Sequence, residues 1–494
     1  GSWIQVPLCS AGRQKEMISD NKVTYHEVDF LLPAQRFNIQ FSYVSQKGLP
    51  FIREFVLRLV HVASMSKAQI ATYFGLTHRE TEEAISDLVQ RGELTLSSDG
   101  RLALTDKSNG YFSEVGEIPH LSTIQDSGCT LSFDLATFSC FSNQAFQDHW
   151  RGGVTLKVDD NNISQSEKLV EKHFQYQFNQ ILDKGYLSHL QVQVGKEQPS
   201  IYTVNSVNKL RQIPLRLTTE FKMDSDGKAV EREDYEQLNS SECVHELMAV
   251  EIARLSRHNN TMSIFKAMQS INDDLTLKLF DSKTNRLNPL FIKDMQALEE
   301  YSSSGRTTFL GPVYSKNNWE KLQKALAPAL NQRIRDKTDY GGSPFIWVAP
   351  SDPYWSKSIR FISSLSNFLS KSATKDKQLY KPVLYVPVRD AADARVARQW
   401  KYELGQFHEY AKGLVEGLLD GNVEILHLED ELSAVIYHIS QPEILPVTMP
   451  LGFITTNKET VKIIGTLVTE YIKGTTGFDK FHDCGAISAM IKKG

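Results

Sequence analysis

The chain has 494 residues, which is too long for one hydrophobic core, so about three domains are expected. Hydrophobic residues make up 41% and charged residues 23% of the chain, as in an ordinary globular protein. The formal net charge of −4 argues against a protein coated in phosphate-binding charge, although a local basic face is compatible with it.

The five cysteines form no C-x-x-C pair, and their number is odd. This pattern argues against a disulfide framework or a cysteine-rich zinc module and favours a reducing compartment. No uninterrupted apolar run approaches the ~20 residues of a membrane span, and the N-terminus lacks the pattern of a secretory signal. We therefore expect a soluble cytoplasmic protein with no membrane partner, no cofactor and no metal.

Residues 1–49 contain two strand patterns. Phe37, Ile39, Phe41 and Tyr43 alternate with polar residues, which puts the aromatic side chains on one face of a strand. Residues 23–32 form a plausible partner strand. The sequence therefore predicts a small N-terminal β-hairpin platform.

Residues 50–107 follow the order helix, helix, turn, helix, hairpin. Ser66 with Gln69, and Thr77 with Glu80, have the spacing of capping boxes, in which side chains satisfy the free amides at a helix start. An Asp99-Gly100 turn lies between two alternating segments, which is a strong hairpin signal. Apolar stripes at helical spacing predict a core made of Ile52, Phe55, Leu59, Ile70, Phe74, Ile85, Leu88 and Leu102.

The stretch SKAQIATYFGLTHRETEEAISDLVQRGEL resembles the core of the winged helix-turn-helix superfamily. The resemblance implies that the third helix enters the DNA major groove and that the wing contacts the DNA backbone. The residues that it places toward DNA are Thr77, His78, Arg79, Glu82, Ser86, Gln90 and, on the wing, Arg101. However, residues 77–91 carry two arginines against four acids, so this helix lacks the charge of a typical DNA reader. The alternative is that the unit packs against another domain or a protein partner.

Residues 108–240 are rich in short β-branched and aromatic runs, which predict a strand-rich domain interrupted by one helix at about 166–184. Residues 241–304 predict a helical connector, with helices at about 242–270 and 288–301. The fold class that we expect is therefore a multidomain α+β protein.

From residue 305 to 494, apolar strands alternate with helical segments, which favours an α/β domain with a largely parallel sheet. Residues 346–348 and 384–386 are apolar on both faces and should be buried central strands. A long helix is expected over about 391–420. Ligands in such sheets bind beyond the carboxyl ends of the strands, which here are residues 348–351, 387–390 and 426–429.

Several clusters in this domain could carry chemistry. Residues 427–431 (HLEDE) and the group Arg389, Asp390 and Asp393 follow strands, and together they could hold a divalent metal, although solvated strand ends are the simpler interpretation. The residues 482–484 (HDC) could join a nucleophile to a base. Aromatic and basic residues interleave at residues 347–360, where core aromatics beside solvated cations are the simpler interpretation.

The region after residue 307 also faintly resembles phospholipase D-like domains in its alternation of strands and helices. The motif of that family places a His two residues before a Lys, and neither His427 nor His438 is followed by such a Lys. We therefore carry no residue over from this resemblance. Phosphate-binding glycine loops and the common hydrolase motifs are also absent from the sequence.

Three hypotheses follow. The first is a non-enzymatic DNA-associated component of a multiprotein bacterial system, such as one for genome defence, with double-stranded DNA and other protein subunits as partners. On charge, its DNA contacts should come more from Arg395, Arg398 and Lys401 than from the third helix. The second is a metal-dependent nuclease or other phosphoester hydrolase, which would need three or more carboxylates or histidines in one pocket. The third is a protein-interaction scaffold.

Overall fold

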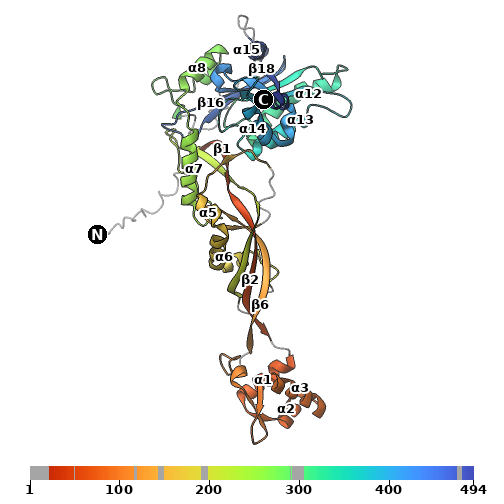
Figure 1. Ribbon diagram of the computed structural model, residues 1–494. Helices are drawn as coiled ribbons and strands as arrows, with labels where there is room; N and C mark the ends of the chain where they lie inside the picture. The colour runs from red at the N-terminus through yellow and green to blue at the C-terminus, as the bar shows by residue number, and fades with distance from the viewer. Residues whose placement is uncertain are drawn as a thin grey trace, which may run out of the picture. The chain divides into compact units, whose positions relative to one another are not determined.

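The structure, a computed structural model, describes residues 22–48, 51–115, 119–142, 150–190, 198–289, 291, 305–474 and 481–493 (Figure 1). Helices and strands occur together, and the described residues form four sheets, as expected of an α+β protein. The chain divides into two compact units, and both are discontinuous in sequence. The larger unit comprises residues 1–33, 145–159 and 214–494, and the smaller comprises residues 34–144 and 160–213.

The smaller unit is built on a long antiparallel ladder. Strand β2 (Ala34–Gly48) pairs along its whole length with β6 (His120–Asp134) and, at its other edge, with β9 (Ser200–Gln212); the short β7 (Cys140–Phe141) completes the sheet. The aromatic residues of β2 lie on one face as predicted, and Phe41 packs against Phe174 with ring centroids 5.2 Å apart. Phe174 belongs to helix α6 (Ser166–Asp183), which agrees with the helix expected at 166–184 and is preceded by the short α5 (Asp160–Ser164).

The N-terminal hairpin that the sequence predicts is wrong. Strand β1 (Val23–Leu32) pairs with β10 (Leu215–Met223) and with the short β8 (Val154–Thr155), and these three strands form a separate sheet in the larger unit. Only Pro33 separates β1 from β2, and a hairpin needs at least two loop residues to reverse the chain. The two strands therefore follow different sheets.

Residues 51–112, which we call the helical module, are inserted between β2 and β6. The last residues of the ladder, Gly48 and His120, are paired, so the two points of attachment are adjacent. The module consists of α1 (Phe51–Val62), β3 (Met65–Ser66), α2 (Lys67–Phe74), α3 (His78–Gln90), β4 (Leu94–Leu96), β5 (Arg101–Leu104) and α4 (Asp106–Asn109).

Both capping boxes form in the module. The Ser66 hydroxyl accepts a hydrogen bond from the amide of Gln69, and the Thr77 hydroxyl accepts one from the amide of Glu80. Strands β4 and β5 pair as the expected hairpin, and Gly100 takes a positive φ of 77° in its turn. These local signals therefore predicted the element boundaries closely.

The core of the module is mostly as predicted. Ile70, Ile85, Leu88 and Leu102 are buried, and Leu59 and Phe74 pack partly buried against them. Ile52 is an error, because its side chain is 48% exposed. The buried stripe of α1 is formed by Val56, Leu57 and Val60, so contact with the core begins one turn after Ile52.

The larger unit contains an eight-stranded sheet in the order β11-β17-β16-β15-β12-β13-β14-β18. Only the pairs β12/β13 and β13/β14 are parallel, so the expected largely parallel sheet is wrong. Strands β15, β16 and β17 follow one another without an intervening helix, and such connections produce antiparallel pairs. The strands are β11 (Arg306–Leu310), β12 (Pro344–Val348), β13 (Lys381–Val388), β14 (Ala411–Val415), β15 (Val423–Leu428), β16 (Leu432–Ile439), β17 (Met449–Thr455) and β18 (Asp483–Ala486).

The prediction that β12 and β13 are buried inner strands is confirmed, since both have a neighbour on each side and residues 346–348 and 384–386 are buried. One face of the sheet packs against α12 (Lys316–Arg335), α13 (Ile359–Ser370), α14 (Ala394–Leu404) and α16 (Ile487–Lys493) through a shared core. Helix α15 (Lys458–Lys473) packs near β15 and β16, with Gly465 directly against the ring of His427.

The long helix expected over 391–420 is also wrong. Helix α14 ends at Leu404, Gly405 follows with a positive φ of 54°, and a 3-10 turn, η2 (Gly405–Tyr410), leads into strand β14. A second turn, η3 (Leu418–Gly421), follows that strand. The helix expected over 242–270 is two helices, α7 (Ser241–Leu255) and α8 (Thr261–Ser270), followed by the short α9 (Asp274–Leu277). The helix expected at 288–301 lies mostly outside the described residues. None of the described helices is both long enough and apolar enough to cross a membrane.

Candidate nucleic-acid interface

Helix α3 presents the side chains that the winged-helix resemblance places toward DNA. His78, Arg79, Ser86 and Gln90 are exposed, and Thr77 is occupied as the N-cap of the helix. The charge of Arg79 is offset on its own helix, because its Nε lies 3.1 Å from the carboxylate of Glu83.

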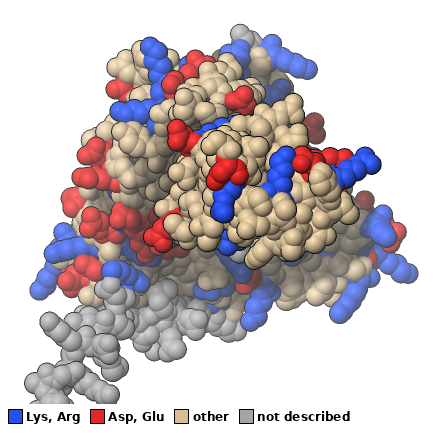
Figure 2. Space-filling model, turned by 90° about the horizontal axis from the view of Figure 1, so that it is seen from below, with Lys and Arg blue, Asp and Glu red and all other residues tan. Residues whose placement is uncertain are grey.

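The other cations of the module are paired in the same way. Arg91 contacts Asp87 at 2.7 Å, and Lys67 of α2 contacts Glu82 at 2.9 Å. Arg101 on the hairpin lies 3.8 Å from Asp99. On the face of the molecule drawn in Figure 2, lysines and arginines are interspersed with acids. A phosphate approaching α3 would therefore compete with carboxylates already in place.

Helix α14 differs in this respect. Arg395, Arg398 and Lys401 are exposed, and within the described part of the chain none of them forms an ion pair. The only acid of the helix, Glu403, is held by Lys357 at 2.5 Å. The buried positions Ala394, Ala397 and Leu404 set the opposite face of α14 against the core. Its outer face is therefore positively charged.

An aromatic side chain continues this face. Tyr402 lies seven residues after Arg395, so the two occupy the same side of the helix, and its side chain is 59% exposed. The Arg151 guanidinium stacks over the Tyr402 ring, with its Cζ 4.5 Å from the ring centroid. We call Arg151, Arg395, Arg398, Lys401 and Tyr402 the α14 surface.

The two acidic clusters expected to share a metal do not meet. Strand β15 runs antiparallel to β12, with Phe345 opposite Leu428, so residues 427–431 emerge at the edge opposite to residues 348–351 and 387–390. Asp393 is instead the N-cap of α14 and accepts a hydrogen bond from the amide of Val396. Within the described residues, no three His, Cys, Asp or Glu side chains are placed to hold a metal ion.

The remaining motifs have structural contacts. His427 is buried, its Nδ1 lies 2.8 Å from Ser433 Oγ, and burial lowers its pKa to about 4, so it is neutral. His482 stacks on Tyr471 with ring centroids 4.2 Å apart, and the Cys484 thiol donates to the His482 carbonyl. Burial also raises the pKa of that thiol. The geometry therefore shows no activated nucleophile at residues 482–484.

The aromatic cluster at residues 347–360 leads to a feature that the sequence analysis missed. Trp347 and Trp355 are fully buried, and both indole N–H groups donate to Glu424 Oε1, at 2.8 and 2.9 Å. The other oxygen of Glu424 lies 3.0 Å from His438 Nε2, and His438 Nδ1 lies 2.6 Å from Asp352 Oδ2. We call His438, Asp352 and Glu424 the buried triad.

Charge balance explains the buried triad. Both ring nitrogens of His438 face carboxylates, so both must donate and the ring must carry a proton. Burial opposes that charge, but the hydrogen bonds to Asp352 and Glu424 raise the pKa of His438 to about 9. Burial likewise disfavours the Asp352 carboxylate, but His438 outweighs it and lowers the pKa of Asp352 to about 2. With no solvent exposure, these groups join β15, β16 and the loop after β12 and cannot contact a substrate.

A signal for this cluster exists in the sequence. Glu424 and His438 are polar residues within otherwise apolar strand runs, VEILHL and AVIYHI. Buried charges persist only when they are paired, so two such residues on neighbouring strands predict a mutual partner. The pairing of Val423 with Tyr437 places Glu424 next to the level of His438.

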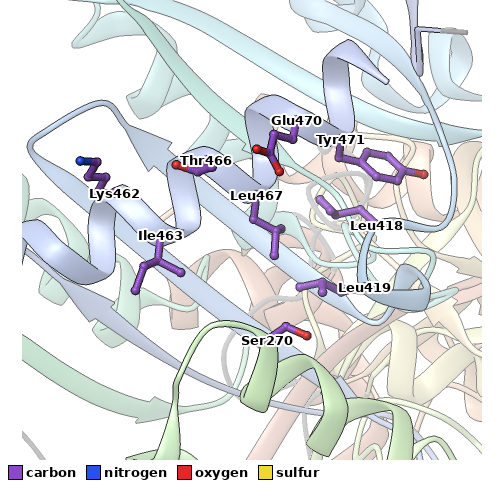
Figure 3. A pocket seen from close by; sticks show the side chains of 9 residues that line it. All are labelled: Ser270, Leu418, Leu419, Lys462, Ile463, Thr466, Leu467, Glu470 and Tyr471. Carbon is purple, nitrogen blue, oxygen red and sulfur yellow. The ribbon is translucent and has the colours of Figure 1, made fainter. Parts of the chain in front are cut away.

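The larger unit also contains an open apolar groove of about 610 Å³ (Figure 3). Ile463 and Leu467 of α15 line it together with Leu418 and Leu419 of η3, and Lys462 and Glu470 add charge. Leu419 has a left-handed backbone, with φ 48°, which is unusual for a leucine. The groove offers packing surface and no cluster of catalytic groups.

Comparison with known proteins does not assign the chain to a class: no protein-family model, no curated protein and no solved structure matches it.

Proposed function

We propose that this protein is a non-enzymatic, nucleic-acid-associated component that binds the backbone of double-stranded DNA through the α14 surface. The observation that carries the proposal is the contrast between two helices. The cations of α3 are paired with acids, whereas Arg395, Arg398 and Lys401 of α14 are not paired within the described residues.

Unpaired cations matter because affinity for DNA depends on neutralising phosphates and releasing counterions. A cation already bound to a carboxylate must give up that contact before it binds a phosphate. Glu403 does not cancel the charge of the α14 surface, since Lys357 neutralises it. Arg151 adds a further cation beside Tyr402. This surface therefore supplies about four phosphate contacts without reorganisation.

The proposal also covers the helical module, which we infer to be a winged helix-turn-helix. Its order of elements, its two capping boxes and its hairpin support this inference. A protein partner is the second candidate for the module, and exposed apolar side chains favour it. Tyr73, Val89 and Leu96 are 68%, 44% and 52% exposed.

The test is binding of the full chain to one DNA duplex over a salt series. The triple variant Arg395→Ala, Arg398→Ala and Lys401→Ala should bind at least tenfold more weakly. It should also reduce the slope of log K against log salt by about 2.7, since each phosphate contact contributes roughly 0.9. Arg79→Ala should change affinity much less, because Glu83 already holds that side chain.

A charge-matched control separates a specific surface from net charge. Lys337→Ala, Lys375→Ala and Lys381→Ala remove three exposed cations of the same unit outside the α14 surface, and they should leave the slope nearly unchanged. If Arg79→Ala abolishes binding while the α14 variant keeps its affinity and slope, the module is the DNA reader and the charge argument is wrong. Equal losses in the control and the α14 variant would also contradict the proposal.

A further inference from the structure

A second cationic site lies away from α14, beside the edge strand β11. A cavity of about 810 Å³ opens between α12, the start of α15 and the β15–β16 turn. Its volume lies in the range of about 300–1,000 Å³ that is usual for small-molecule sites. Its lining comes from segments far apart in the sequence, which the eight-stranded sheet brings together.

Three lysines dominate the charge of this cavity. Lys321 and Lys324 lie on one face of α12, and Lys458 is the first residue of α15. Within the described residues none of the three forms an ion pair. Three ammonium groups around one cavity repel one another, so an anion with several oxygens is the ligand that relieves the repulsion.

The acids of the cavity restrict the ligand further. Asp430 and Glu431, in the turn between β15 and β16, line the same cavity and form no ion pair within the described part of the chain. A plain polyanion would be repelled by these carboxylates. A ligand that also carries hydroxyl or amino donors would be bound by them, as carboxylates bind ribose hydroxyls in dinucleotide sites.

The rest of the lining is apolar. Ala325, Pro328 and Ala329 of α12 and Ile454 of β17 add small, rigid side chains. Such a surface suits a flat ring, which gains from leaving water without forcing the wall to rearrange. Lysines, carboxylates and an apolar wall thus match phosphate, sugar and base in turn.

We propose that this cavity binds a nucleoside 5′-phosphate. The ammonium groups of Lys321, Lys324 and Lys458 hold the phosphate, Asp430 and Glu431 accept hydrogen bonds from the sugar hydroxyls, and the base lies on the α12 wall. This site is separate from the α14 surface, because Lys321 and Lys324 lie on a different helix. The nucleoside 5′-phosphate comes either as a soluble nucleotide or as the 5′ end of a DNA strand.

The experiment is calorimetric titration of the full chain with ATP, AMP, adenosine, tripolyphosphate and a 5′-phosphorylated single-stranded DNA. ATP should bind more tightly than AMP, AMP more tightly than adenosine, and tripolyphosphate more weakly than ATP. Competition between the DNA and ATP would identify a strand end, and binding of free nucleotides alone would identify a soluble ligand. Both results support the site.

Variants test the roles of the two charges. The double variant Lys321→Ala and Lys324→Ala should weaken ATP at least tenfold per lost charge-assisted contact, whereas the exposed Lys375→Ala should have no effect. Asp430→Asn keeps a residue that tolerates its positive φ of 61°. It should weaken ATP severalfold and strengthen tripolyphosphate. Tripolyphosphate binding as tightly as ATP, or no nucleotide binding at millimolar concentration, would overturn the proposal. Loss of duplex binding in the α14 variant has no bearing on these results.

Discussion

Replacing His438 by alanine should destabilise the larger unit more than any exposed substitution. The change removes a proton shared between two carboxylates and leaves Asp352 and Glu424 facing each other without solvent exposure. Neither carboxylate can remain charged in that environment without a partner, so the cost extends beyond the lost hydrogen bonds.

Two independent arguments give the same magnitude. Removing one partner from a buried ion pair costs roughly 3–5 kcal/mol. The rise in the pKa of His438 from 6.5 to about 9 corresponds to about 3 kcal/mol of folding free energy, at about 1.36 kcal/mol for each unit of pKa. We therefore expect the free energy of unfolding to fall by about 3–5 kcal/mol at pH 6.

The pH dependence has a definite sign. Because the pKa of His438 is higher in the folded protein, its contribution is complete below pH 6.5 and is lost as the pH rises through 9. The pKa of Asp352 is lowered from 3.8 to about 2, so its contribution is complete above pH 3.8 and is lost as the pH falls through 2. The stability that the buried triad confers should therefore be greatest between pH 4 and 6.5.

Urea denaturation at pH 6 and pH 9.5 provides the measurement. The difference between the wild-type protein and His438→Ala should be larger at pH 6, while the exposed His258→Ala should match the wild type at both values. A loss below about 1 kcal/mol at pH 6 would refute the reasoning, since it would mean that His438 is neutral and the carboxylates share a proton instead.

Three other predictions concern local contacts. Thr77→Ala removes the cap of α3 and should cost about 1 kcal/mol, measured by urea denaturation of the helical signal in circular dichroism. Gly465→Ala would place a Cβ 2.6 Å from the His427 ring and should lower stability by about 1–3 kcal/mol in thermal denaturation, whereas Gly342→Ala, with open space around it, should be nearly neutral. Burial raises the pKa of the Cys140 thiol, so a thiol reagent at pH 8 should label it only after unfolding, and rapid labelling of the folded chain would contradict this.

Elements set by neighbouring residues could be predicted from the sequence. The capping boxes at Ser66 and Thr77 and the turn at Gly100 depend on residues within about four positions, and all three form as expected. Residues 346–348 are buried because every side chain of that run is apolar. In each case, the physical cause lies inside the segment itself.

Pairing between distant strands could not be predicted in this way. The hydrophobic pattern of β15 fits a parallel or an antiparallel neighbour equally well, and the absence of a helix before β16 was the signal that the analysis passed over. The same holds for charge. The sequence shows that α3 has more acids than arginines, but only geometry shows that Arg79 and Arg91 are individually neutralised while Arg395 and Arg398 are not.

The placement of β1 has a consequence for synthesis of the protein. Val23 pairs with Met223, so β1 leaves the ribosome about 200 residues before its main partner strand exists. At a translation rate of roughly 5–20 residues per second, that interval lasts about 10–40 s. The helical module completes its own pairings, such as Leu94 with Leu104, well within the interval. During that time the apolar end of β1 exposes an unpaired edge, and a nascent-chain chaperone that shields it should raise the yield of folded protein.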